Sequence, residues 1–221
     1  MPPENPTNSS DIIVESIVVG PLQTNVYVVG CAKTRSGAII DAGGNAQGLL
    51  KLAQKHDLKV DSILQTHAHI DHVAAIPEVK RATQAPIYLH PADQFMWQAA
   101  PQQGLRFGIQ VEPLPPYEHE LSDGQRVRVG ELEAEVIFVP GHSPGSVAFY
   151  FADYDLVLSG DVLFAGSMGR VDLPGSDPAA MRKSLERMKA LPDQTRVLPG
   201  HGPETSIGRE KKLNPFLRGD W

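Results

Sequence analysis

The sequence contains a single cysteine, Cys31, among its 221 residues, which excludes an internal disulfide framework. Long apolar runs are also lacking: they extend over about six residues at most, whereas a membrane-spanning helix needs about 20. Basic residues are outnumbered, 20 Lys and Arg against 26 Asp and Glu, and the net charge of −6 argues against a nucleic-acid partner. Residues 1–11 show neither a basic nor an apolar segment, so no secretory signal is expected. We therefore expect a cytoplasmic protein with no membrane partner.

The overall composition excludes an intrinsically disordered chain. Apolar residues make up 41% and charged residues 21% of the sequence, which are ordinary values for globular proteins. Residues 1–10 are polar and contain prolines, so we expect a flexible segment there and a single domain over residues 11–221. The 20 glycines and 19 prolines predict frequent turns between short elements.

Strand-like segments alternate with a few helical ones. Alternating or β-branched residues predict strands at 12–19, 25–29, 38–40, 60–65, 87–89, 125–129, 132–139, 147–151, 156–158 and 197–198. Apolar spacing predicts helices at 46–56, 73–83 and 178–189. Pro77 must lie in the first turn of its helix or kink it. The order of strands followed by a helix occurs twice, which favours an α+β or α/β fold. Two such halves can face each other as a four-layer αββα sandwich.

Three of the eight histidines stand within six residues, in His67-Ala68-His69-Ile70-Asp71-His72. An ordinary loop would bring these desolvated rings together without any gain in free energy. A divalent cation removes that cost, because imidazole and carboxylate groups are ligands suited to Zn²⁺, Fe²⁺ or Mn²⁺. The segment follows a predicted strand and precedes a predicted helix, so several of its side chains can converge on one point. This stretch is therefore a candidate metal site.

Three further candidate ligands follow short apolar strands, each directly after a glycine: His142, Asp161 and His201. A glycine at that place permits close approach of the backbone and unusual backbone angles. Each residue alone is more simply a turn residue. Together with the first stretch, they supply enough ligands for two metal ions.

This pattern resembles the metallo-β-lactamase superfamily, whose signature is Thr/Ser-His-x-His-x-Asp-His followed by a distant His, Asp and His. Here the signature covers Thr66 to His72, and the match extends over nearly the whole chain. The resemblance implies the αββα sandwich, with two mixed sheets and helices outside. It also implies the metal ligands. The first metal would be bound by His67, His69 and His142, and the second by Asp71, His72 and His201. Asp161 would bridge the two metals.

The same resemblance assigns roles near the metals. Asp41, in Ile-Asp-Ala-Gly-Gly, matches an acidic position that orients a ligand loop instead of binding metal. Asp71 is the expected catalytic residue, since it would accept a hydrogen bond from the attacking hydroxide. We expect two divalent ions per chain, with Zn²⁺ favoured over Fe or Mn.

Residue types distinguish the branches of the superfamily. The flavodiiron oxygen reductases carry a carboxylate where this chain has His69. The nucleic-acid-processing branch has a large extra domain and a basic groove, which this acidic chain lacks. True β-lactamases are periplasmic and often have cysteine where Asp161 stands here. All three branches are therefore disfavoured.

Residues 160–175, 201–210 and 214–217 are most similar to short, single-domain relatives of glyoxalase II. Two features depart from the two-domain glyoxalase II enzymes. Only 20 residues follow His201, where those enzymes have a helical domain that helps to bind glutathione, and Pro203 replaces a tyrosine. Arg170 matches a basic position that contacts glutathione in those enzymes, while an ion pair with Asp172 is the simpler interpretation.

The expected reaction is hydrolysis of a small thioester such as S-D-lactoylglutathione by a metal-bridging hydroxide. A thiolate leaves without a strong general acid, because a free thiol has a pKa of about 8.5. Residues 91–120 would form a wall or lid over the metals, where Phe95, Met96, Trp97 and Phe107 would contact the substrate unless they only pack the insert.

Three alternatives remain open at this stage. A mononuclear iron persulfide dioxygenase would use His67, His142 and Asp161 and would bind one metal. A lactone or ester hydrolase would use the same two-metal centre. A non-catalytic metal-binding module is disfavoured, since structural zinc sites are usually closed by four protein ligands. The sequence leaves the acyl group and the oligomeric state undetermined.

Overall fold

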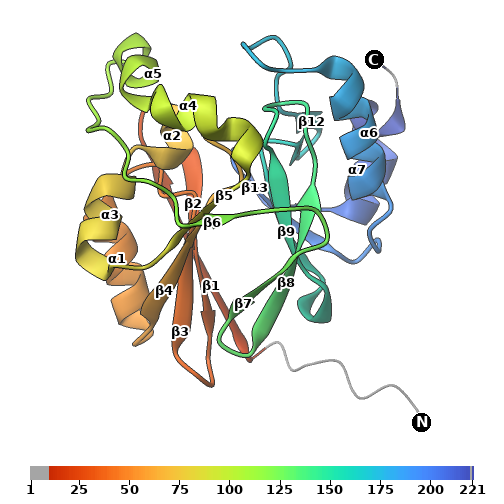
Figure 1. Ribbon diagram of the computed structural model, residues 1–221. Coiled ribbons are helices and arrows are strands. Elements are labelled where there is room, and N and C mark those ends of the chain that lie inside the picture. Colours follow the sequence, from red (N-terminus) through yellow and green to blue (C-terminus); the bar gives the residue numbers. More distant parts are fainter. Residues whose placement is uncertain (1–9, 220) are drawn as a thin grey trace.

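The computed structural model describes residues 10–219 and 221, so the predicted flexible segment lies outside the described residues except for Ser10. Two sheets stack face to face, and helices cover the outer face of each (Figure 1). This is the αββα sandwich that the sequence predicts. No helix among the described residues is long and apolar enough to cross a membrane.

The first sheet has six strands in sequential order. They are β1 (Ile12–Val19), β2 (Thr24–Cys31), β3 (Ser36–Ile40), β4 (Lys59–Leu64), β5 (Ile87–Leu89) and β6 (His119–Glu120). The first three strands pair antiparallel, and β3 to β6 pair parallel. The sheet is therefore mixed, as expected.

The second sheet has the strand order β14-β13-β10-β9-β8-β7 and is also mixed, because only β10 and β13 pair parallel. Its strands are β7 (Arg126–Val129), β8 (Leu132–Phe138), β9 (Val147–Phe151), β10 (Leu156–Gly160), β13 (Arg196–Pro199) and β14 (Thr205–Ser206). A small separate hairpin joins β11 (Leu163–Phe164) to β12 (Ser167–Met168).

Helices α1 (Ala46–Lys55) and α3 (Ile76–Thr83) cover the first sheet, while α6 (Pro178–Lys189) and α7 (Ile207–Leu213) cover the second (Figure 1). The helix predicted over 73–83 starts earlier, at α2 (Ile70–Val73), and is interrupted before α3. Pro77 lies in the first turn of α3, where its missing N–H has no helical partner to lose. The remaining helical segments are η1 (Pro91–Asp93), α4 (Gln94–Gln98), α5 (Ala100–Arg106), η2 (Ala152–Tyr154) and α8 (Pro215–Arg218).

Three apolar layers separate the four structural layers. In β9, Phe149 and Phe151 pack between the sheets, whereas Ala148 and Tyr150 pack on the opposite face, in the cluster that includes Met181 of α6. The strand is buried on both faces, which explains its nearly continuous apolar sequence. On the other side, α1 and α3 bury their apolar faces against the first sheet.

The candidate ligands follow strands whose carboxyl ends meet at one edge of the sandwich. Strand β3 leads to Asp41, β4 to the His67–His72 segment, β8 to His142, β10 to Asp161 and β13 to His201. Side chains that follow strands running in one direction converge at the same edge, the usual place for ligand sites in open sheets.

Candidate metal centre

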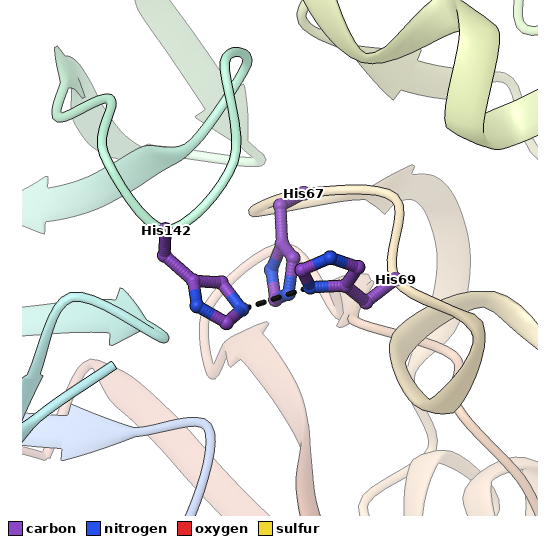
Figure 2. A group of neighbouring side chains, drawn as sticks. All are labelled: His67, His69 and His142. Carbon is purple, nitrogen blue, oxygen red and sulfur yellow. Dashed lines mark hydrogen bonds between the residues drawn. The ribbon is translucent and has the colours of Figure 1, made fainter. Parts of the chain in front are cut away.

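His67, His69 and His142 form one group of converging imidazoles. Figure 2 shows the three rings turned toward one another from the loop after β4 and the loop after β8. One ring nitrogen from each lies within 4.8 Å of the others, and Nδ1 of His69 is 2.8 Å from Nε2 of His142. Three nitrogen donors at this spacing can bind one transition-metal ion.

Asp71, His72 and His201 form a second group with the same spacing. Oδ2 of Asp71 lies 3.4 Å from Nε2 of His72 and 3.3 Å from Nε2 of His201. Two residues come from the start of α2 in the first half of the molecule, and His201 comes from the end of β13 in the second. The set of two nitrogens and one carboxylate oxygen suits a second divalent ion.

Asp161 lies between the two groups. Its Oδ2 is 3.4 Å from Nε2 of His142 and 3.3 Å from Nε2 of His201, and its Oδ1 is 3.4 Å from Nε2 of His72. The carboxylate thus contacts members of both groups. All seven residues predicted as metal ligands therefore lie together in the structure.

A layer of hydrogen bonds fixes which ring nitrogen faces the centre. Asp41 accepts hydrogen bonds from the backbone N–H and hydroxyl of Thr66 at 2.7 Å, and it pairs with Nδ1 of His72 at 2.9 Å. Nδ1 of His142 donates to the backbone oxygen of Arg170 at 2.8 Å. Such partners orient ligand imidazoles. Asp41 thus contacts the ligand loop at Thr66 and His72, and it also forms a group with His67 and His72 whose ligand atoms lie within 4.8 Å of one another.

Three inward-facing atoms of the centre make no hydrogen bond. Nε2 of His67, Nε2 of His72 and Oδ1 of Asp161 are buried and make no hydrogen bond. Buried polar atoms almost always find a partner, and leaving them unpaired costs about 1–3 kcal/mol each. Divalent ions at the centre would satisfy all three atoms, so the residues present fit two metals.

The three imidazoles of the first group are neutral at physiological pH. Burial and the neighbouring imidazoles hold the pKa of His67 well below its usual value and lower the pKa of His69 to about 3. Burial also lowers the pKa of His142. Neutral imidazole is the form that binds metal, so this group is ready to accept an ion.

The second group has the opposite electrostatics. Burial lowers the pKa of His72, but Asp71 and Asp161 outweigh that effect and raise it to about 9. Burial also lowers the pKa of His201. Hydrogen bonds to the same two carboxylates outweigh burial and raise this pKa to about 10. Positive charge is therefore favoured at this place, whether it is carried by protons or by a metal ion.

No sequence pattern indicated Asp93, although its side chain joins both loops of the first group. Its side chain is fully buried at the end of η1, and its Oδ2 accepts from the Ala68 N–H at 3.0 Å and the Ser143 hydroxyl at 2.8 Å. Its Oδ1 accepts from the Gly145 N–H at 2.5 Å. The three donors lower the pKa of Asp93, but burial outweighs them and raises it to about 6. In the sequence it follows Pro91 in an unremarkable turn.

Two residues of strand β2, Thr24 and Asn25, support the second group through hydrogen bonds that no sequence pattern indicated. The Thr24 hydroxyl donates to Oδ2 of Asp71 at 2.8 Å. The Asn25 side chain donates to the backbone oxygens of Pro199 and Gly202, at 2.9 and 2.8 Å, on either side of His201. The two bonds from Asn25 join the first sheet to the end of β13 and the loop that follows it. Nothing in the alternation of a buried strand marks two of its residues as partners of a distant loop.

A cavity of about 580 Å³ opens directly onto the centre, with His69, Asp71, His142, Asp161 and His201 in its wall. Its far wall is made by the segment predicted to form a wall or lid: Phe95, Met96 and Phe107 line it, together with other residues of α4 and α5. Trp97 is instead buried beneath α4.

Arg170 forms the ion pair that its sequence position predicts, and it also lies at the cavity. Its side chain lines the cavity and pairs with Asp172 through two hydrogen bonds of 2.6 and 2.8 Å. The ion pair is exposed on both sides, so its contribution to stability is small.

Residues 19–201 match the family model described as the metallo-β-lactamase superfamily. The chain therefore belongs to this superfamily, as its sequence motif indicates. Membership, together with the grouped histidines and aspartates, identifies a metallo-hydrolase that uses divalent metal.

Three related proteins place the chain further. Hydroxyacylglutathione hydrolase GloC of Haemophilus influenzae is 34% identical over 208 residues, which cover 92% of this chain and 97% of that protein. The crystal structure of TTHA1623 in a di-iron-bound form has a TM-score of 0.84 and 42% identity, covering 92% of this chain and 100% of that one. The structure of the B3 metallo-β-lactamase BLEG-1 has a TM-score of 0.86 and 36% identity, with 93% and 99% covered. These similarities confirm the fold and support the resemblance to glyoxalase II.

Proposed function

We propose that this protein is a two-metal thioesterase that cleaves S-D-lactoylglutathione or a close analogue, with Zn²⁺ as its metal. The supporting observation is the gathering of seven candidate ligands beside a cavity of about 580 Å³, where buried atoms of His67, His72 and Asp161 make no hydrogen bond. The similarity to GloC gives the substrate class. When bound, the metals supply water that deprotonates near neutral pH and positive charge beside the attacked acyl oxygen.

Asp71 is the residue that we assign to orienting the attacking water. It lines the cavity, and the Thr24 hydroxyl holds its Oδ2 in place. A carboxylate in this position accepts a hydrogen bond from the water and directs the water lone pair at the acyl carbon. Asp41 and Asp93 act behind the ligands by fixing the orientation of their loops.

The leaving group favours a thioester over an amide. Apart from the five residues of the metal centre, the described residues that line the cavity include no carboxylic acid and no histidine. His90 stacks on Phe138 and His119 packs against Tyr88, and neither histidine lines the cavity. A departing thiolate needs no proton at that moment, because the pKa of its thiol is only about 8.5.

The test combines metal content with turnover. Protein purified without added metal should hold about two metals per chain and should hydrolyse S-D-lactoylglutathione. Asp161→Ala should lose metal and lower kcat/KM by more than about 100-fold. Asp193→Ala removes an exposed carboxylate on the α7 side and should change neither quantity.

Other outcomes distinguish the alternatives. Two metals retained in Asp161→Ala would contradict the bridging role. One iron per chain with oxygen uptake on glutathione persulfide would indicate a dioxygenase. Efficient cleavage of a cephalosporin without thioesterase activity would favour the second candidate, a β-lactamase, for which the similarity to BLEG-1 is the supporting observation. Metal without cleavage of any thioester, lactone, aryl ester or β-lactam would indicate a non-catalytic module.

A further inference from the structure

The cavity wall opposite the metals is a helical insert, α4 and α5, that stands over the first sheet (Figure 1). Two anchors fix it. The Gln103 side chain donates to the backbone oxygens of Met96 at 2.8 Å and Ala68 at 3.5 Å, and the indole of Trp97 donates to Pro115 at 2.9 Å. One anchor is thus attached between the two metal-binding histidines His67 and His69. Gln103 thus ties α5 to α4 and connects the insert to the loop after β4.

The end of α5 is directed back toward the cavity by a close backbone contact. A Cβ atom at Gly104 would lie 2.3 Å from the backbone oxygen of Ile109, so only glycine permits this contact. The tight turn places Arg106 and Phe107, the last helical residue and its cap, at the cavity wall. The positions of these two side chains therefore follow from the fold of the insert.

The insert exposes aromatic surface to the cavity. Phe95 is 50% exposed and Phe107 is 49% exposed, although both line the cavity. The ring of Phe95 reaches the opposite wall, since a Cβ at Gly175 would lie 3.2 Å from its Cζ. Large apolar side chains left open in a concave site gain free energy when a ligand covers them.

The two arginines that line the cavity, Arg106 and Arg170, differ in their partners. Arg170 is already paired with Asp172. Arg106 also lines the cavity but makes no ion pair or hydrogen bond through its guanidinium within residues 10–219 and 221. A planar guanidinium matches the geometry of a carboxylate and can donate two hydrogen bonds to it. Arg106 is therefore a free anion-binding group beside open aromatic surface.

We propose that this wall determines substrate choice: Phe95 and Phe107 cover an apolar acyl group, and Arg106 pairs with a carboxylate of the thiol portion. The inference rests on the proposed thioesterase function and extends it. Within the proposed class, the preferred substrates are thioesters of a carboxylate-bearing thiol whose acyl group is larger and more apolar than lactoyl.

Two thioesters with the same acyl group test Arg106: S-D-lactoylglutathione, whose thiol portion carries carboxylates, and S-lactoyl-N-acetylcysteamine, whose thiol portion carries none. Arg106→Gln should raise KM for the glutathione thioester by about 5- to 10-fold and leave KM for the neutral one unchanged. Raising the ionic strength should raise the wild-type KM for the anionic substrate alone, and Arg106→Gln should lose that dependence. Arg106→Lys should restore part of the effect.

Arg209→Gln is the matched control, since it removes the same charge from an exposed position on α7. It should behave as wild type with both substrates. Equal effects of Arg106→Gln on the two thioesters, or no effect on either, would overturn the role of Arg106. If the metal-loaded wild type cleaves neither thioester, the proposed function itself fails, so the two failures are distinguishable.

The aromatic surface is tested with S-mandeloylglutathione, which keeps the thiol and replaces the lactoyl methyl group by a phenyl ring. Wild-type kcat/KM should be higher for the mandeloyl than for the lactoyl thioester, and Phe107→Ala should reduce that ratio by about 5-fold. Leu213→Ala, which truncates an exposed apolar side chain on α7, should leave the ratio unchanged. An unchanged ratio in Phe107→Ala would overturn the acyl-binding role.

Discussion

At the scale of single residues, the metal centre depends as much on missing side-chain atoms as on the ligands. Gly200 packs against Asp161 and His72 so closely that a Cβ would lie 2.1 Å from Oδ1 of Asp161 and 2.9 Å from Cε1 of His72. Gly160 has a φ of +50°, a left-handed conformation that side chains disfavour. Close packing requires a glycine before each ligand, because a Cβ would also lie 2.5 Å from Cα of Met181 at Gly141 and 2.5 Å from the Thr66 hydroxyl oxygen at Gly160.

Gly200→Ala should displace the Asp161 carboxylate and weaken metal binding at the second group, lowering kcat/KM by about 100-fold or more. Metal analysis and thermal unfolding of the purified variant check this. Gly202→Ala is the matched control: Gly202 has a φ of +77° but open space around its Cα, so alanine there adds backbone strain without steric contact. A Gly200→Ala variant that keeps two tightly bound metals would contradict the steric argument.

At the scale of elements, the short turn η1 connects two ligand loops that are more than 70 residues apart in sequence. Asp93 makes this connection through Ala68 on one loop and Ser143 and Gly145 on the other. Each of the three partners donates, so a carboxylate with acceptor oxygens alone matches all of them. The first imidazole group therefore owes its geometry to a residue that contacts none of its rings.

Asp93→Asn should weaken metal binding at the first group by about 10- to 100-fold, because the new amide N–H₂ faces a donor. The second group, which Asp93 does not touch, should keep its affinity. Competition with a chelator gives the two dissociation constants separately. Asp123→Asn makes the same change at an exposed aspartate that accepts from Phe138 and Arg187. An equal loss of metal affinity at both groups would indicate a general loss of structure.

At the scale of the whole molecule, the charges of the centre couple folding to pH and to metal. The pKa values of His72 and His201 are raised to about 9 and about 10 in the folded protein, compared with about 6.5 in an unfolded chain. Protons on these rings therefore stabilise the metal-free protein below pH 6.5, and that stabilisation is lost as pH rises through 9 to 10.

The melting temperature of the metal-free protein should consequently fall by roughly 5 °C or more between pH 7 and pH 10. The metal-loaded protein should show much less dependence, since bound metal holds the same rings deprotonated throughout. Below pH 6.5 the lowered pKa values of His67 and His69 act in the opposite direction and destabilise the metal-free fold. Calorimetry with and without a chelator measures the melting temperature below pH 6.5 and between pH 7 and pH 10. A melting temperature of the metal-free protein that does not change with pH would contradict the raised pKa values of His72 and His201.

The sequence was most informative where periodicity and flanking turns were strong. The strands at 12–19, 87–89 and 147–151 and the helix at 178–189 have the predicted bounds. Two-residue strands such as β11, β12 and β14 were not predicted, because two residues cannot show alternation. Helix α2 begins inside the histidine segment, where polar ligands mask the apolar spacing of a helix.

The candidate ligands were predictable because each follows a strand end, a property of the chain itself. The residues that support them were not, since their roles arise from contacts between distant segments. Thr24 lies 47 positions from Asp71, and Asp93 lies 50 from Ser143. Arg106 carried no signal either, because its significance comes from the cavity wall that the folded insert creates.

Each imidazole group draws its members from both halves of the sandwich, and this division has a consequence for assembly. His67 and His69 meet His142 across the seam, and Asp71 and His72 meet His201. An ion bound by either group would therefore link the two halves, and the metal-loaded protein should hold them together more firmly than the metal-free protein.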